Sequence, residues 1–236
     1  MPPLVFFDVD KTLLKGYSGF YTTLLLIQKG ILKKRRILQA LYYRLIGPIR
    51  EGTPSARQSL QRMYEIAIQD MAGSSLDDVL KIGRECFDRW IRPRLYRQAI
   101  EAVEEHKKKG HPIYLMTSGP YMTLQILGDF LGVDARYSAG PVIRNNILTS
   151  ELRLPICYRE GKVEAAEDAL KRHGAQWKDC YYYGDSADDI FLLEKVGHPR
   201  AVNPDPVLQK TAQERDWSIL TFRHCLGRSP EAKGSL

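Results

Sequence analysis

The segment Leu4-Val5-Phe6-Phe7-Asp8-Val9-Asp10-Lys11-Thr12 is the most informative part of this chain about its fold. It opens with four apolar residues, a run typical of a short strand that is buried on both faces of a sheet. Two carboxylates follow where that strand ends. Because side chains alternate along an extended chain, Asp8 and Asp10 are expected to share a face there. The sequence therefore predicts a strand that presents two acidic side chains at one edge of a sheet.

Strand-like and helix-like segments alternate through the second half of the chain. Short apolar runs predict strands, and apolar residues at helical spacing, closed by glycines, predict the helices between them. Chains of this kind form mostly parallel sheets with helices on both faces. We therefore predict an α/β fold with a Rossmann-like core built from residues 1–15 and 93–222. The predicted strands are 4–7, 112–116, 180–183 and 200–202, with shorter strands around a turn at Asn145-Asn146.

Residues 16–92 follow a different pattern. Apolar residues recur every three or four positions, and glycines and prolines interrupt them at intervals. This pattern predicts an all-helical cap inserted after the first strand. The remaining residues, 223–236, are polar and are predicted to form a frayed C-terminal tail.

Composition and cysteine usage narrow the class of protein. The chain has 236 residues, of which 44% are hydrophobic and 27% charged, as in an ordinary globular protein. Its best apolar run, Leu24 to Ile27, is far too short to cross a membrane. We find no secretory signal, and the scattered Cys86, Cys157, Cys180 and Cys225 predict reduced thiols rather than a zinc site or disulfides. The sequence thus predicts a cytoplasmic protein.

Positive charge is concentrated near the N-terminus. Between Lys11 and Arg50 there are nine lysines and arginines and no acidic residue, while the whole chain carries a net charge of +7. Such a segment indicates an anionic partner or simply a solvated helix face. As a basic amphipathic cap it predicts peripheral contact with the inner membrane surface and a lipid-like substrate. No nucleic-acid motif is present, and we expect no nucleic-acid partner.

Polar residues end three of the predicted strands. Asp8 and Asp10 end the first, Thr117-Ser118-Gly119 the second, and the segment 184–189, with Asp185 and Asp189, follows the third. Ligands of open α/β sheets bind at the carboxyl ends of the strands, so these groups are expected to converge. Several carboxylates in one pocket repel one another unless a cation is present. Mg²⁺ is the expected cofactor, because it is a hard ion that joins carboxylates to phosphate groups.

Taken in order, these motifs resemble those of the haloacid dehalogenase (HAD) superfamily, and most closely its phosphoserine-phosphatase-like branch. The resemblance covers nearly the whole chain. Four motifs carry it: Phe7 to Leu13 matches D-x-D-x-T, Leu115 to Pro120 matches a strand ending in Ser or Thr, Lys162 matches the lysine of the third motif, and Gly184 to Asp189 matches G-D-x-x-x-D.

The resemblance implies a covalent mechanism. Asp8 is expected to attack phosphorus and to become an aspartyl-phosphate. Asp10 is expected to protonate the leaving alcohol and later to deprotonate the attacking water. Thr117 and nearby backbone N–H groups, including that of Gly119, are expected to hold the phosphoryl oxygens. Ser118 is the alternative hydroxyl if the register of the strand differs by one residue.

The resemblance also implies how charge is balanced. Lys162 is expected to neutralise the nucleophile and to bind the transferring phosphoryl group. Mg²⁺ is expected on the carboxylates of Asp8 and Asp185 and on the backbone carbonyl of Asp10. Asp189 is expected to be a ligand through water or to orient the other ligands.

Asp10 also separates the reactions of this superfamily. An acid two residues after the nucleophile is implied for phosphatases and phosphomutases, whereas dehalogenases lack it and P-type ATPases carry threonine. We predict a magnesium-dependent phosphomonoester hydrolase. A phosphotransferase or phosphomutase, and a lipid-surface binding protein on the same fold, are the alternatives.

The substrate is expected to differ from phosphoserine. Phosphoserine phosphatases carry a glutamate shortly after the first motif, but here the matching stretch is Lys15-Gly16-Tyr17-Ser18, and no acid appears before Glu51. We therefore expect a small-metabolite or lipid-like phosphate ester. Asp188 is open to two interpretations, as a first-turn helix residue favoured by the helix dipole or as a residue near the metal. The sequence leaves the oligomeric state open.

Overall fold

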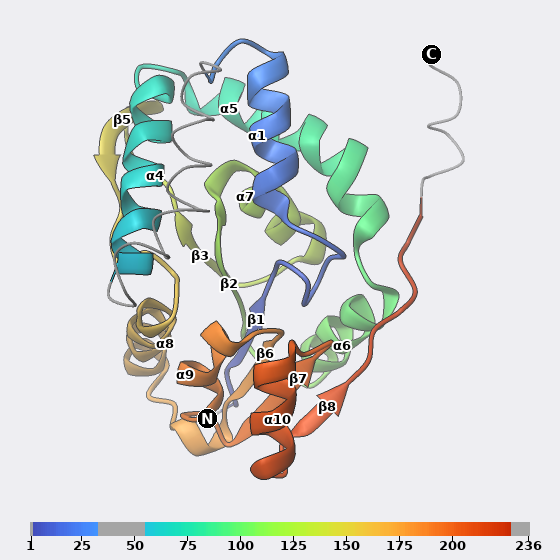
Figure 1. Cartoon of the computed structure of the whole chain (residues 1–236). Coiled ribbons are helices and arrows are strands. Elements are labelled where there is room, and N and C mark those ends of the chain that lie inside the picture. The colour runs from blue at the N-terminus through green and yellow to red at the C-terminus, as the bar shows by residue number, and fades with distance from the viewer. Residues whose placement is uncertain (1, 33–54, 228–236) are drawn as a thin grey trace.

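A computed structural model describes residues 2–32 and 55–227 of the chain (Figure 1). Much of the basic segment, including Lys33-Lys34-Arg35-Arg36, lies outside the described residues, so the predicted membrane-facing surface does too. Among the helices of the described part, none is both long and apolar enough to cross a membrane.

The core is a parallel sheet of six strands in the order β3-β2-β1-β6-β7-β8, with β1 near its centre. The predicted α/β, Rossmann-like fold class is confirmed. The strands are β1 Val5–Asp8, β2 Ile113–Pro120, β3 Ala135–Ala139, β6 Tyr181–Gly184, β7 His198–Val202 and β8 Ser218–Leu220.

Helices cover both faces of this sheet. Side chains alternate between the two faces along each strand, so β1 places apolar side chains on both faces, and helices bury them. Phe7 packs into one hydrophobic cluster with residues of α6 and α7, and its neighbour Phe6 packs into a second cluster with residues of α8, α9 and α10. Both phenylalanines are fully buried, as a two-sided strand requires. The helices are α6 Arg97–Lys108, α7 Tyr121–Leu131, α8 Glu160–His173, α9 Ile190–Leu193 and α10 Pro206–Glu214, with short 3-10 turns η3 Trp177–Asp179 and η4 Ala187–Asp189.

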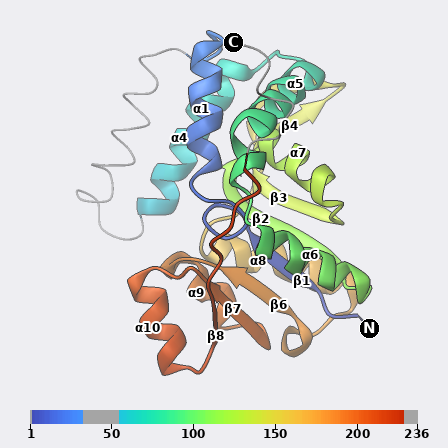
Figure 2. The same cartoon turned by 90° about the vertical axis from the view of Figure 1, so that its right-hand side faces the viewer.

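A third cluster joins the helices after β1 to a β-hairpin. Met71 and Val79 pack there against Leu148 of the hairpin. Its turn falls at Asn145 and Asn146, as predicted, and both residues have positive φ. Figure 2 shows α1, α4 and α5 gathered at one end of the molecule, away from α9 and α10. The elements are α1 Ser18–Gln28, α4 Ser55–Met71, α5 Leu76–Cys86, the π-helix η1 Phe87–Ile91, the 3-10 turn η2 Arg92–Arg94, and the hairpin strands β4 Pro141–Arg144 and β5 Ile147–Leu152.

The C-terminal part differs from the sequence prediction in two ways. β8 adds an unforeseen edge strand next to β7. Residues 223–227, which we expected to fray, run along the start of α6. Arg97 donates its backbone N–H to His224 at 2.7 Å, and Leu226 donates to Leu95 at 2.9 Å. Backbone hydrogen bonds of this kind do not depend on side-chain polarity, so the polar sequence gave no sign of them.

His106 gives a prediction about stability. Its ring is buried, with Nε2 3.0 Å from the Tyr183 hydroxyl and Nδ1 3.0 Å from Nδ1 of His111. Burial, reinforced by the neighbouring His111, Lys109, Arg200 and His198, lowers the pKa of His106 to about 4 from 6.5. Between these values the unfolded chain binds the extra proton, so stability is lost as the pH falls.

Between pH 6.5 and pH 4.5, we expect the unfolding free energy of His106→Gln to fall by about 2 kcal/mol less than that of wild type, because the variant has no histidine to protonate at this position. Urea unfolding at the two pH values measures this difference. The exposed His224 provides the control, and His224→Gln should keep the wild-type pH dependence. Equal pH dependence in both variants would contradict the assignment.

Candidate active site

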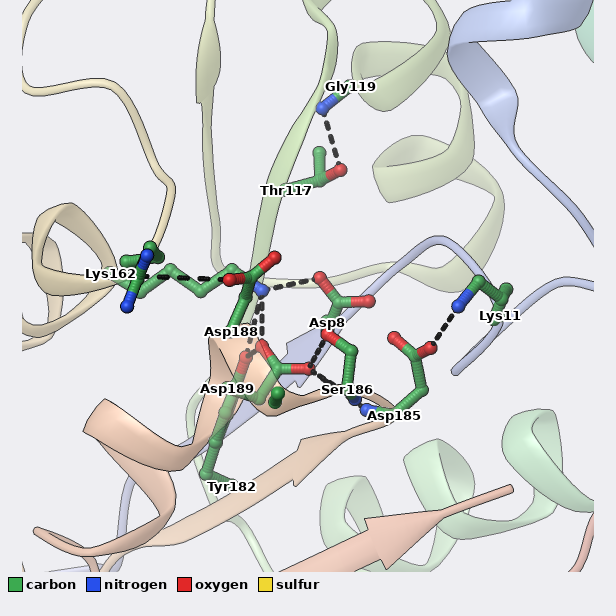
Figure 3. A network of polar contacts seen from close by, with 12 residues as sticks. Asp8, Lys11, Thr117, Gly119, Lys162, Tyr182, Asp185, Ser186, Asp188 and Asp189 are labelled. Atoms are coloured by element: carbon green, nitrogen blue, oxygen red, sulfur yellow. Dashed lines mark hydrogen bonds and ion pairs between the residues drawn. The ribbon is translucent and has the colours of Figure 1, made fainter. Parts of the chain in front are cut away.

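Neighbouring strands bring the predicted motifs together. β1 lies between β2 and β6, so the carboxyl ends of all three meet at one edge of the parallel sheet. Asp8 ends β1 and Asp185 directly follows β6. Thr117 lies inside β2, which continues to Pro120 instead of ending at residue 116 as predicted, and its pairing with β3 becomes irregular after Thr117. All three side chains are buried. Figure 3 shows Asp8, Lys162 and Asp189 directed at one another, with dashed lines that mark the hydrogen bonds of Lys162 to both carboxylates.

Lys162 is the cation of this cluster. It lies in the first turn of α8, is 5% exposed, and places Nζ 2.6 Å from Asp8 Oδ1 and 2.6 Å from Asp189 Oδ1. Burial by itself would lower the pKa of Lys162, but the carboxylates of Asp189 and Asp8 outweigh it and hold that pKa well above its ordinary value. The lysine is therefore charged.

At Asp8, burial and neighbouring negative charges outweigh the positive charge of Lys162. Burial, together with the charges of Asp189 and Asp185, raises the pKa of Asp8 well above its ordinary value, although Lys162 opposes the shift. A carboxylate in this state needs further positive charge to stay ionised.

Asp189 holds the loop that follows β6. Its Oδ1 accepts hydrogen bonds from Lys162 and from Tyr182, and its Oδ2 accepts from the backbone N–H groups of Asp185 at 2.9 Å and Ser186 at 3.2 Å. A Cβ at Gly184 would lie 2.7 Å from the Asp189 carboxylate, so this position needs glycine. Both Asp189 oxygens are thus engaged, which fits an orienting residue better than a direct metal ligand.

An acidic triad of Asp8, Asp185 and Asp189 offers oxygens that all lie within 4.8 Å of one another. Burial and Asp189 raise the pKa of Asp185 to about 6, against the opposing effect of Lys11. The donors are carboxylate oxygens in a buried position, which fits a hard divalent cation. Asp8 and Asp185 are the direct ligands that this geometry supports, because the oxygens of Asp189 already accept hydrogen bonds.

Asp10 and Thr117 have hydrogen-bond partners outside the triad. The Asp10 carboxylate accepts a 2.8 Å hydrogen bond from the backbone N–H of Ser18, at the start of α1. Thr117 Oγ1 accepts one from the N–H of Gly119 at 2.8 Å. A Cβ at Gly119 would lie 2.6 Å from Ser18 Oγ, so only glycine lets α1 approach this closely. Ser118, the alternative hydroxyl, is half-buried.

Asp188 is not part of the triad. It belongs to the 3-10 turn Ala187–Asp189, its side chain is 42% exposed, and one of its oxygens is 3.7 Å from Nε of Arg159. It is not among the three carboxylates that come within reach of one cation. The geometry therefore favours the first-turn interpretation of Asp188.

Two residues at the site were not singled out from the sequence. Lys11 adopts a left-handed backbone, with φ 63°, and its ammonium is 2.8 Å from Asp185 Oδ2. Tyr182, interpreted only as part of a buried strand, places its hydroxyl 2.9 Å from Lys162 Nζ. Lys11 lies inside the first motif, which was a usable signal, whereas nothing in the strand pattern distinguished Tyr182 from its tyrosine neighbours.

Comparison with known proteins settles the family. The model of haloacid dehalogenase-like hydrolases matches residues 5–194. The chain belongs to this family. It is similar to a phosphoserine phosphatase of Mycobacterium tuberculosis, with 28% identity over 92% of this chain and 70% of the relative. It is also similar to a histidinol-phosphatase of Neisseria meningitidis, with 26% identity over 94% of this chain and 100% of the relative.

The chain is also similar to a solved structure. A protein of unknown function from Bordetella pertussis Tohama I has a TM-score of 0.78 and 27% identity, over 93% of this chain and 98% of its own. The HAD family and its phosphoserine-phosphatase-like branch, both predicted from the motifs, are confirmed. The chain is an enzyme of the HAD phosphatase type.

Proposed function

We propose that this HAD phosphatase hydrolyses small-metabolite or lipid-like phosphate monoesters through an aspartyl-phosphate on Asp8. The observation that carries the proposal is the pairing of a buried Asp8 with Lys162 at 2.6 Å, beside two further carboxylates. An anionic nucleophile approaches an anionic phosphate only where fixed positive charge offsets their repulsion. Lys162 provides part of that charge within the chain.

The proposed reaction has two steps. In the first, an Asp8 carboxylate oxygen bonds to phosphorus, the ester P–O bond breaks, and Asp10 gives its proton to the leaving oxygen. In the second, Asp10 takes a proton from water, the water oxygen bonds to phosphorus, and the bond between phosphorus and Asp8 breaks. Inorganic phosphate leaves and Asp8 is regenerated. The Ser18 N–H holds the Asp10 carboxylate in place through both steps.

Mg²⁺ is the proposed cofactor. Asp8, Asp185 and the backbone carbonyl of Asp10 would hold it, and it would supply the remaining positive charge for the transferring phosphoryl group. In this proposal Thr117 and the Gly119 N–H bind phosphoryl oxygens, and Asp189 keeps Asp185 oriented.

The residues at the start of α1 support the proposal of an organic, anionic substrate. Lys11 Nζ lies 5.3 Å from the centre of the Tyr17 ring. Tyr17 is 43% exposed and Phe20 is 64% exposed, and the first turn of α1 has no acidic residue that would bind an ammonium group. We propose that residues 16–92 form a cap that shields the site from water. Contact with a membrane through the basic segment also remains a proposal.

A panel of phosphate esters tests the proposed activity. Released inorganic phosphate is measured for phosphoserine, phosphocholine, sugar phosphates, nucleotides and lysophosphatidate micelles, each with Mg²⁺ or with EDTA. We expect turnover only with Mg²⁺ and a preference for an ester other than phosphoserine. Efficient turnover of phosphoserine would contradict the substrate class, and activity that survives EDTA would contradict the metal.

Asp10→Asn tests the proton transfer. For alkyl phosphates we expect kcat to fall about 10²-fold to 10⁴-fold, because the leaving alkoxide needs a proton. For p-nitrophenyl phosphate the loss should be smaller, since its leaving group is stable as an anion. Initial rates on the two ester types measure the ratio. An equal loss on both esters would argue against Asp10 as the general acid.

Lys11→Gln tests the charge balance at Asp185. The Lys11 ammonium forms an ion pair with Asp185 Oδ2 at 2.8 Å, so a cation that binds Asp185 must compete with Lys11. We expect Mg²⁺ to bind the variant about fivefold more tightly, which corresponds to about 1 kcal/mol for a half-exposed ion pair. Calorimetric titration with Mg²⁺ measures the affinity without turnover. The exposed Lys15, changed to Gln, is the control, and weaker binding by Lys11→Gln would contradict the competition.

A further inference from the structure

Tyr182 brings a hydroxyl into the catalytic cluster from inside the sheet. The residue is fully buried, and its ring packs in the cluster formed with α8, α9 and α10. Its hydroxyl donates to Asp189 Oδ1 at 2.5 Å and accepts from Lys162 Nζ at 2.9 Å. Burial, followed by the charge of Asp189, raises the pKa of Tyr182 well above its ordinary value, so the hydroxyl keeps its proton.

The contacts of Lys162 use its whole donor capacity. A lysine ammonium has three N–H donors. Lys162 directs them to Asp8, Asp189 and Tyr182, at 2.6, 2.6 and 2.9 Å. Three partners in different directions fix both the place and the rotation of the ammonium. Tyr182 is the uncharged member of the set, and its position does not depend on the charge of the reacting groups.

The hydroxyl also limits how strongly Asp189 attracts the lysine. Asp189 Oδ1 accepts from both Tyr182 and Lys162. Without the hydroxyl, the full charge of that oxygen would face the ammonium and draw it away from Asp8. When Asp8 is phosphorylated, the negative charge on that side moves from the Asp8 carboxylate to the phosphoryl oxygens, whereas the charge of Asp189 stays where it is.

We propose that Tyr182 is a positioning residue that holds the Lys162 ammonium against Asp8 throughout the reaction. The proposal rests on the proposed function, because it assigns Lys162 to the phosphoryl-transfer step. Tyr182 touches neither the substrate nor the reacting phosphorus in this role. It acts only through Lys162 and Asp189, in the manner of residues that orient the direct participants in a site.

The chain offers a matched control in the next residue. Tyr183 lies on the same strand and points to the other face of the sheet, where its hydroxyl contacts His106. Each variant therefore deletes one buried oxygen from β6. Tyr182→Phe does so at the site, and Tyr183→Phe does so on the other face of the sheet. Both variants are compared with wild type in kcat, KM, urea unfolding, and inhibition by orthovanadate and by inorganic phosphate, all with Mg²⁺.

For Tyr182→Phe we expect kcat to fall about 10-fold to 100-fold while KM stays within about threefold. Vanadate mimics the transition state, so its inhibition constant should rise by a similar factor, whereas that of inorganic phosphate should change little. Tyr183→Phe should stay close to wild type in all four kinetic measurements.

Three results would overturn the proposal, and they are distinguishable. If wild type hydrolyses no phosphate ester, the proposed function fails and the role of Tyr182 fails with it. If wild type is active but Tyr182→Phe has the same kcat as Tyr183→Phe, only the role of Tyr182 fails. If kcat falls only in proportion to the unfolded fraction, or if vanadate affinity is unchanged, the hydroxyl serves stability rather than positioning.

Discussion

Asp8→Asn is expected to lower kcat by about 10⁴-fold or more, because the amide cannot form the covalent intermediate. Asp8 ends the strand near the centre of the sheet and has its carboxylate against Lys162 at 2.6 Å. The substitution keeps the size of the side chain and an oxygen for Lys162 to contact. It also removes one of three clustered negative charges, so the fold should survive.

Phosphate release from the best ester measures the loss, and urea unfolding confirms that the variant is folded. Asp88 is an exposed aspartate far along the chain, so Asp88→Asn is the control for a generic change of charge. A folded Asp8→Asn protein that retained a tenth of wild-type activity would place the nucleophile elsewhere.

Lys162→Met is expected to damage both stability and activity. Removing the ammonium leaves the buried carboxylates of Asp8 and Asp189 without their shared partner. Breaking a buried ion pair from one side costs about 3–5 kcal/mol, since the remaining charge stays desolvated. We expect a loss of unfolding free energy in that range in EDTA, and a fall in kcat/KM of about 10³-fold when Mg²⁺ is present.

Urea unfolding in EDTA and in Mg²⁺ separates these effects. A bound divalent cation offsets part of the repulsion between the carboxylates, so the stability deficit should shrink when Mg²⁺ is added. Lys171 is an exposed lysine in the last turn of the same helix, and Lys171→Met is the control. If Lys162→Met were as stable as Lys171→Met in EDTA, the buried carboxylates would have to be protonated rather than paired.

The two variants should differ in stability because Lys162 makes more contacts than Asp8 in the charge network that they share. Lys162 contacts two carboxylates and a hydroxyl, whereas Asp8 contacts Lys162 through one oxygen. Loss of the cation therefore leaves a larger imbalance than loss of one anion. For the same reason, we expect the stability cost of Lys162→Met to exceed that of Asp8→Asn.

Features that depend on the local order of residues could be predicted from the amino-acid sequence. An apolar run of strand length followed by Asp8 predicts a buried strand with an acid at its end, because burial and side-chain alternation act between near neighbours. The same reasoning placed Asp185 directly after another strand, and it expected Thr117 just after a strand that in the structure continues to Pro120. Parallel strands align their carboxyl ends, so the convergence of these residues followed from the fold class.

Tertiary structure alone decided which side chains touch. Lys162 and Asp8 are 154 residues apart, and Lys11 and Asp185 are 174 residues apart, so no local pattern relates them. The strand order of the sheet and the packing of α8 against it create these contacts. Tyr182 shows most clearly what the sequence does not predict. An apolar strand pattern predicts that its ring is buried, but it does not predict where its hydroxyl points. The hydroxyl acquires a role only where the fold places Lys162 and Asp189 around it.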